Sequence, residues 1–198
     1  MLSRNIHEKR ELLVVVDMIR GFIEQGSLIS DPAISIIIDD NVELIKDFTR
    51  REQAVIALRD AHGADSPEFA NYPLHCLKGS MESALVDAIG VFEDQMLVID
   101  KNTTNGFHTP EFQSFNKSEP PLKRIIISGC CTDICILPFA LTLKTYLQTM
   151  KDTTEVIVFQ DAIETFDAPG HPRKEINEFS YMLLRNAGIL VSAKRENN

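Results

Sequence analysis

The sequence has 198 residues, which suits one domain, and its 44% hydrophobic and 25% charged residues are typical of a globular protein. Its formal net charge of −9 argues against a nucleic-acid partner, which would require a basic face. No apolar run is long enough to span a membrane and the polar start is not a signal peptide, so we expect one cytoplasmic domain over residues 1–198 with no membrane partner.

Short apolar runs alternate with helix-length stretches along the whole chain. The predicted strands cover residues 12–16, 54–58, 95–99, 124–128, 156–159 and 189–192. The predicted helices cover residues 35–51, 81–89, 133–150 and 175–186, and the polar stretch 102–121 is predicted to be a long loop. This alternation predicts an α/β, Rossmann-like fold of three layers, with a mostly parallel six-stranded sheet and helices on both faces.

Residues able to carry chemistry follow four of the predicted strands. Asp17, Asp60 and Lys101 each lie just after an apolar run, and the segment 129–135 follows the run at 124–128. Ligands of open α/β sheets bind beyond the carboxyl ends of the strands. We therefore expect these four segments to meet at one edge of the sheet.

The segment from Gly129 to Cys135 is predicted to turn from a strand into a helix. Thr132 and Asp133 are residue types that cap helix N-termini, which would place Cys135 in the first turn. There the helix dipole would stabilise a thiolate, and free backbone N–H groups could receive an oxyanion. A buried cysteine is otherwise a small apolar packing residue, so this segment alone leaves both roles open.

Asp17 and Lys101 are candidates for a base and its cationic partner. A carboxylate at the end of an apolar strand is partly desolvated, which raises its pKa and suits it to take a proton from a thiol. Lys101 could pair with Asp17 or stabilise a developing negative charge. The alternatives are a turn-capping aspartate and a solvated surface lysine.

Two carboxylates and two imidazoles occur within sixteen residues, at Asp60, His62, Glu68 and His75. This donor set suits zinc, with manganese or iron as the alternatives. A divalent metal there could bind a ring nitrogen of a substrate or activate a water molecule. Spacing alone leaves open a polar loop in which both histidines bond only to the backbone.

With these residues the chain resembles the isochorismatase-like cysteine hydrolases and, within them, the nicotinamidase branch. The resemblance runs from Val14 to about Ala193. Its matching stretches are residues 16–18, Phe22, residues 26–28, Asp60 and His62, Glu68, residues 73–80, Lys101, Phe107 and residues 129–136. The chain departs from the family at residues 18–21 and at Cys130 and Cys131, which could reshape the pocket.

The resemblance implies a role for each matching residue. Cys135 would be the nucleophile, preceded by a non-proline cis peptide between Cys130 and Cys131. The backbone N–H groups of Cys131 and Cys135 would form the oxyanion hole. Phe22 and Phe107 would hold a substrate ring between them.

The activity implied by the resemblance is that of a metal-containing cysteine amidohydrolase acting on nicotinamide, a small-molecule amide. The alternatives are another member of the family acting on a different small amide, a carbamoyl compound or a vinyl ether, and a non-catalytic binding protein on the same fold. The sequence leaves the oligomeric state open, a homo-oligomer included.

Overall fold

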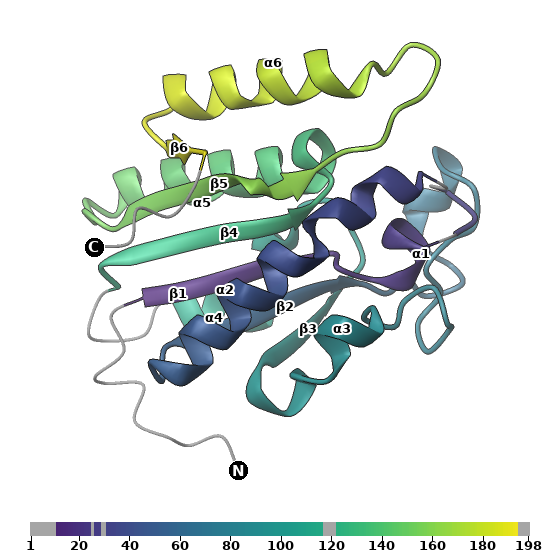
Figure 1. Ribbon diagram of the computed structural model, residues 1–198, viewed down its shortest axis with the longest axis horizontal. Coiled ribbons are helices and arrows are strands. Elements are labelled where there is room, and N and C mark those ends of the chain that lie inside the picture. Colours follow the sequence, from purple (N-terminus) through teal and green to yellow (C-terminus); the bar gives the residue numbers. More distant parts are fainter. Residues whose placement is uncertain (1–10, 25, 29–30, 117–121, 194–198) are drawn as a thin grey trace.

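Six parallel strands form one sheet in the order β3-β2-β1-β4-β5-β6 (Figure 1). The computed structural model describes residues 11–24, 26–28, 31–116 and 122–193. The strands are β1 (Glu11–Val16), β2 (Ala54–Asp60), β3 (Leu97–Lys101), β4 (Arg124–Cys130), β5 (Glu155–Glu164) and β6 (Leu190–Ser192). The predicted fold class is confirmed, and the main difference in strand length is at β5, which continues well past residue 159.

Both faces of the sheet are covered, as the continuous apolar runs predict. Every residue of β1 is buried. One face carries α1 (Arg20–Ile23), α2 (Ile38–Arg50) and α3 (Asp87–Gly90), and the other carries α4 (Pro110–Asn116), α5 (Leu137–Thr149) and α6 (Arg173–Asn186) (Figure 1). None of the helices in the described residues combines the length and apolar character that crossing a membrane requires.

Short helical turns connect these elements, and they change three of the predictions. The turns are η2 (Pro32–Ile37), η3 (Pro67–Ala70), η4 (Glu93–Gln95), η5 (Gly106–His108) and η6 (Thr132–Ile136), the last a π-helical turn. The predicted helix at 133–150 therefore begins as a π turn, and the one at 35–51 begins as the 3-10 turn η2. The predicted loop at 102–121 contains η5 and α4, and its residues 117–121 lie outside the described residues.

The predicted helix at 81–89 is wrong for most of its length, because only α3 is helical there. The preceding residues instead run beside the segment that follows β1. The amides of Arg20 and Gly21 donate to the carbonyls of Ala84 and Glu82, both at 2.9 Å, and Ile19 and Leu85 form an isolated antiparallel bridge. The conformation of these residues is therefore determined by their hydrogen bonds to the segment after β1, although their apolar residues have the spacing of a helix.

The close approach of β4 to the end of β1 depends on Gly129. Its φ of 110° lies in the region that favours glycine, and a Cβ there would lie 1.9 Å from the carbonyl oxygen of Val16. Only glycine allows the chain to pass this point. The passage brings the segment carrying Cys135 beside the residue that follows β1, which is Asp17.

Candidate active site

Asp17 is completely buried immediately after β1. Its backbone has a positive φ of 52°, a conformation that aspartate adopts more readily than most residues. The Asp17 amide donates to the carbonyl of Leu58 at 2.8 Å, and its Oδ1 accepts a hydrogen bond from the amide of Asp60 at 2.9 Å. The carboxylate is therefore fixed between the ends of β1 and β2.

Lys101 ends β3 and places its ammonium group between two carboxylates. Nζ lies 2.9 Å from Oδ2 of Asp17 and 2.9 Å from Oδ1 of Asp60, and it donates to the carbonyl of Thr103 at 3.2 Å. All three charged side chains are buried. Burial opposes the charge of Lys101, but the negative groups around it, Asp17 first, hold its pKa well above the usual value.

The two carboxylates respond oppositely to this shared cation. Burial raises the pKa of Asp17 to about 6, even though the charge of Lys101 opposes the shift. Burial acts on Asp60 in the same direction. There, however, the charge of Lys101 and hydrogen bonds from His62 and His75 outweigh burial and lower the pKa of Asp60. Asp17 is therefore the carboxylate suited to exchange a proton near neutral pH.

Cys135 lies in η6 and is buried. Burial raises the pKa of its thiol well above the usual value, although the charge of Lys101 opposes this. The resting group is therefore a neutral thiol that needs a base. Burial thus acts against the thiolate expected at the helix start, because desolvation outweighs the nearby positive charge of Lys101.

The turn around Cys135 is built differently from a capped helix start. The amides of Cys135 and Ile136 both donate to the carbonyl of Cys131 at 3.1 Å. The N-cap residue is Cys131, and no side chain caps the turn, so the predicted capping by Thr132 and Asp133 is wrong. The peptide bond between Cys130 and Cys131 is cis, which confirms the expectation drawn from the family resemblance.

Asp60, His62 and His75 form a buried donor group that fits a divalent metal ion. One ligand atom from each lies within 4.8 Å of the others. Oδ2 of Asp60 is 2.8 Å from Nε2 of His62 and 3.4 Å from Nε2 of His75. Nδ1 of His75 is 2.7 Å from the carbonyl of Pro73, a contact that leaves Nε2 available to a metal. Two imidazoles and a carboxylate, with an open side, suit zinc, manganese or iron.

A small cavity lies over this group and over the thiol. Its lining residues are Phe22, Leu28, Asp60, Glu68, Tyr72, His75, Lys101, Thr104, Cys131, Ile134 and Cys135. Glu68 is thus on the cavity wall but outside the compact donor group, and burial raises its pKa.

The two predicted aromatic residues are not brought together. Phe22 lines the cavity, and its ring centroid is 6.2 Å from that of His75. Phe107 does not line the cavity, because its ring packs in the core against Phe112 and Tyr146 at 5.8 and 5.3 Å. The cavity wall instead includes Leu28 and Ile134, which lie in stretches that match the family but were given no binding role, since isolated aliphatic residues carry no signal of one.

Glu82 joins two walls of the site and was also missed. Its Oε1 accepts hydrogen bonds from the amide and hydroxyl of Ser27 at 2.8 and 2.7 Å, and its Oε2 accepts one from the amide of Cys76 at 2.8 Å. It therefore holds the residue next to Leu28 and the residue next to His75. The predicted helix over 81–89 gave no reason to connect Glu82 with Ser27 or Cys76, which lie in other segments of the chain.

Comparison with known proteins adds a sequence relationship to this geometry. The chain matches the isochorismatase domain family over residues 11–189. It is 33% identical to nicotinamidase 1 of Arabidopsis thaliana in an alignment 179 residues long, which covers 83% of this chain and 73% of that protein.

Solved structures share the fold. The nicotinamidase of Bacillus subtilis superimposes with a TM-score of 0.79 at 22% identity, over 92% of this chain and 99% of that one. The pyrazinamidase of Pyrococcus horikoshii, solved in complex with zinc, gives 0.71 at 23% identity, over 92% and 98%. At these identities the likeness establishes the arrangement of strands and helices, and the chemistry has to be argued from the residues of this chain.

Proposed function

The chain belongs to the isochorismatase family, and from this premise we propose that it is a metal-containing cysteine amidohydrolase that converts nicotinamide and water to nicotinate and ammonia. The observation that carries the proposal is one cavity lined by Cys135, Lys101, Asp60 and His75, with Asp17 buried beside them. A nucleophile, a base with its cation, and a metal-ligand set thus share one site. The 33% identity to a nicotinamidase supports the substrate.

Formation of the acyl-enzyme begins with the neutral thiol of Cys135. Asp17 takes the thiol proton as the sulfur attacks the carboxamide carbon, so no free thiolate has to exist in the buried site. Lys101 keeps Asp17 ionised before attack. Asp17 then gives the proton to the departing nitrogen, ammonia leaves, and a thioester to Cys135 remains.

In the proposed mechanism, the backbone N–H groups of Cys131 and Cys135 stabilise the negative charge that develops on the substrate oxygen. The Cys135 amide donates to the Cys131 carbonyl at 3.1 Å, so it would have to share its hydrogen with the substrate oxygen. Water then attacks the thioester, with Asp17 accepting its proton. Nicotinate leaves, and the thiol of Cys135 is restored.

Asp60, His62 and His75 would hold the metal ion, with Glu68 on the cavity wall beside them. When bound, a divalent ion such as zinc supplies a Lewis acid that can accept a pyridine nitrogen or lower the pKa of a water molecule. Phe22 packs against one side of the substrate ring. The apolar side chains of Leu28 and Ile134 exclude water from the cavity, which favours a planar aromatic amide.

The test of the reaction is ammonia release from nicotinamide by wild type and by Cys135→Ala. We expect turnover by wild type, no turnover by the variant, and a thioester adduct on Cys135 in intact-protein mass spectrometry after rapid quench. Equal rates for both proteins would contradict the assignment of Cys135 as the nucleophile. If the wild type hydrolysed an aliphatic amide or a carbamoyl compound but not nicotinamide, the proposed substrate would be wrong, whereas the proposed hydrolase activity would stand.

The metal role has a test that does not depend on activity. Protein stripped with a chelator and then given zinc chloride should unfold at a higher temperature, by an amount equivalent to about 2.7 kcal/mol when zinc is at 100 times its Kd. His75→Gln should lose most of this shift. An identical melting curve with and without zinc, in wild type, would contradict the metal site.

A further inference from the structure

A second set of contacts, made by residues that do not line the cavity, holds the π turn. Asp133, two residues before Cys135, places its carboxylate between two residues of the loop that joins β5 to α6. Oδ1 accepts a hydrogen bond from the Thr165 hydroxyl at 2.7 Å, and Oδ2 accepts one from Nε2 of His171 at 2.9 Å. One carboxylate thus ties the turn that carries the nucleophile to a distant loop.

The ring of His171 is held on three sides. It stacks on Phe166, with 3.9 Å between ring centroids and 6° between planes. Its Nδ1 is 3.0 Å from the carbonyl of Phe166, and backbone hydrogen bonds of 2.8 and 3.2 Å join His171 to Ala168. Both ring nitrogens face oxygens that only accept, so the doubly protonated ring satisfies both contacts. The contact is not a loose surface pair, because the side chains of His171 and Asp133 are only 19% and 21% exposed.

In the π turn, the Asp133 side chain forms hydrogen bonds to another part of the chain, while Ile136 anchors the turn by packing in the core. Thr132 is completely buried, and its hydroxyl has no hydrogen-bond partner among the described residues. Inside the turn, one carbonyl, that of Cys131, receives the amides of both Cys135 and Ile136. A π-helical turn is a rare arrangement that often marks a functional site. The two hydrogen bonds of Asp133 therefore add a polar constraint on the orientation of a turn that otherwise rests on the packing of buried residues such as Ile136.

We infer that His171 is a positioning residue, which through Asp133 orients the turn that aims the Cys135 thiol and amide into the cavity. His171 does not line the cavity, so it acts on the reaction only through the turn. This inference rests on the proposed function for the role of Cys135. It adds a residue that neither the motif around Cys135 nor the cavity lining identifies.

The first experiment measures kcat and KM for His171→Gln with nicotinamide. A shift of well under 1 Å in a nucleophile slows attack without altering the cavity walls, so we expect kcat to fall about tenfold with KM within about twofold. His171→Arg, which can still donate to Asp133, should recover most of the loss. The matched control is His108→Gln, at an exposed histidine of the loop after β3, which should leave kcat unchanged.

The second experiment asks whether the effect passes through Asp133. The double variant Asp133→Asn/His171→Gln should have the same kcat as Asp133→Asn alone, within about twofold, because each of the two substitutions disrupts the same contact between Asp133 and His171. Additive losses would overturn the inference, since His171 would then act by another route. If His171→Gln fails to fold, the isosteric Asp133→Asn, compared with Thr165→Val, carries the same test.

The third experiment needs no substrate, so it separates this inference from the proposed function. The rate at which iodoacetamide alkylates Cys135, followed by peptide mass spectrometry, should change in His171→Gln by the same factor as kcat, with no change in His108→Gln. If wild type does not hydrolyse nicotinamide, the proposed function fails while the alkylation rate still tests His171. A lowered melting temperature with unchanged kcat and alkylation would reduce His171 to a structural role and overturn the inference.

Discussion

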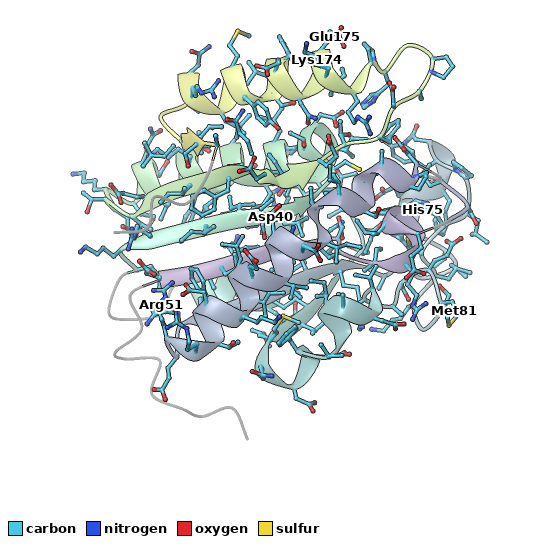
Figure 2. All side chains as sticks on the ribbon, viewed as in Figure 1. Asp40, Arg51, His75, Met81, Lys174 and Glu175 are labelled. Atoms are coloured by element: carbon cyan, nitrogen blue, oxygen red, sulfur yellow. The ribbon has the colours of Figure 1, made fainter. Side chains whose placement is uncertain are left out.

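Carboxylates are buried at both ends of the parallel sheet, but the two ends differ in how many cationic side chains each carboxylate contacts. At the amino end, Glu11 meets two guanidinium groups, those of Arg51 and Arg124, and Arg51 also pairs with Asp47. At the carboxyl end, Asp17 and Asp60 share the single ammonium group of Lys101. Figure 2 labels Arg51 at the first end and His75 at the second, with the length of the sheet between them.

The difference in charge ratio appears in the pKa values. Burial would raise the pKa of Glu11, but the hydrogen bonds and charges of Arg51 and Arg124 outweigh it and lower the pKa. With one cation between two carboxylates, the pKa of Asp17 is instead raised to about 6. A carboxylate with surplus cations contributes stability, whereas one short of cations is available to move a proton. The amino end is built for folding and the carboxyl end for chemistry.

The largest effect should come from removing the shared cation. Lys101→Met leaves Asp17 and Asp60 buried without a positive partner, which should lower the free energy of unfolding by about 3–5 kcal/mol. The repulsion also raises the pKa of Asp17 further, so the base becomes protonated at neutral pH and turnover is lost. Chemical denaturation and ammonia release measure the two effects.

The sign of the pH dependence sharpens this prediction. When folding raises the pKa of an acid, the folded state is destabilised at pH values where the acid is ionised in the unfolded chain, and this cost shrinks as the pH falls. The loss of folding stability in Lys101→Met should therefore be smaller at pH 5 than at pH 8. Lys78→Met is the matched control, since Lys78 is also a lysine paired with a carboxylate, that of Asp100 at 3.0 Å, but its side chain is 71% exposed. It should cost about 1 kcal/mol or less. Similar losses in the two variants would contradict the buried shared cation.

A large effect on activity alone is expected for Asp17→Asn. The amide side chain keeps the hydrogen bond from the Asp60 amide but cannot take the thiol proton, so kcat should fall about 10³-fold. Asp60 still neutralises Lys101, so the melting temperature should stay within a few degrees of wild type. Stopped assays of ammonia and calorimetry measure these quantities. Retention of more than a tenth of wild-type kcat would remove Asp17 as the base.

The contrast between the ends also explains how far the sequence could predict the structure. Uninterrupted apolar runs such as Leu12–Val16 predict strands buried on both faces, and Asp17 and Lys101 are predicted at one edge because each follows such a run. The strand order is not encoded in any run, so the sharing of Lys101 between Asp17 and Asp60 could not be predicted. Phe107 was expected beside the substrate from the family resemblance, yet its ring turns into the core.

Contacts that depend on loops were the least predictable. Asp133 looks like a helix cap in sequence, and only the return of the loop before α6 gives it Thr165 and His171 as partners. Glu82 was hidden in a segment with helical spacing. In both cases a polar side chain bonds to a residue far away in sequence, and no local pattern records such a pairing.

The smallest predicted effect tests the amino end of the sheet. Glu11→Gln removes the charge that Arg51 and Arg124 surround and should lower the free energy of unfolding by about 1.5–3 kcal/mol at pH 7. Because the folded pKa of Glu11 lies below its usual 4.5, this stabilisation is complete above about pH 5 and is lost as the pH falls through the folded pKa. The difference between the two proteins should therefore shrink in acid.

Glu24→Gln is the control for this change, because Glu24 pairs with Arg20 at 3.3 Å at a half-exposed position and should cost about 0.5 kcal/mol or less at pH 7. Denaturant titrations of the three proteins from pH 3 to pH 8 provide the comparison, and ammonia release from nicotinamide should be the same for all three. A loss of turnover in Glu11→Gln at full folding would mean that the two ends of the sheet are coupled. A stability difference that persists unchanged at pH 3 would mean that Glu11 stabilises by packing and not by charge.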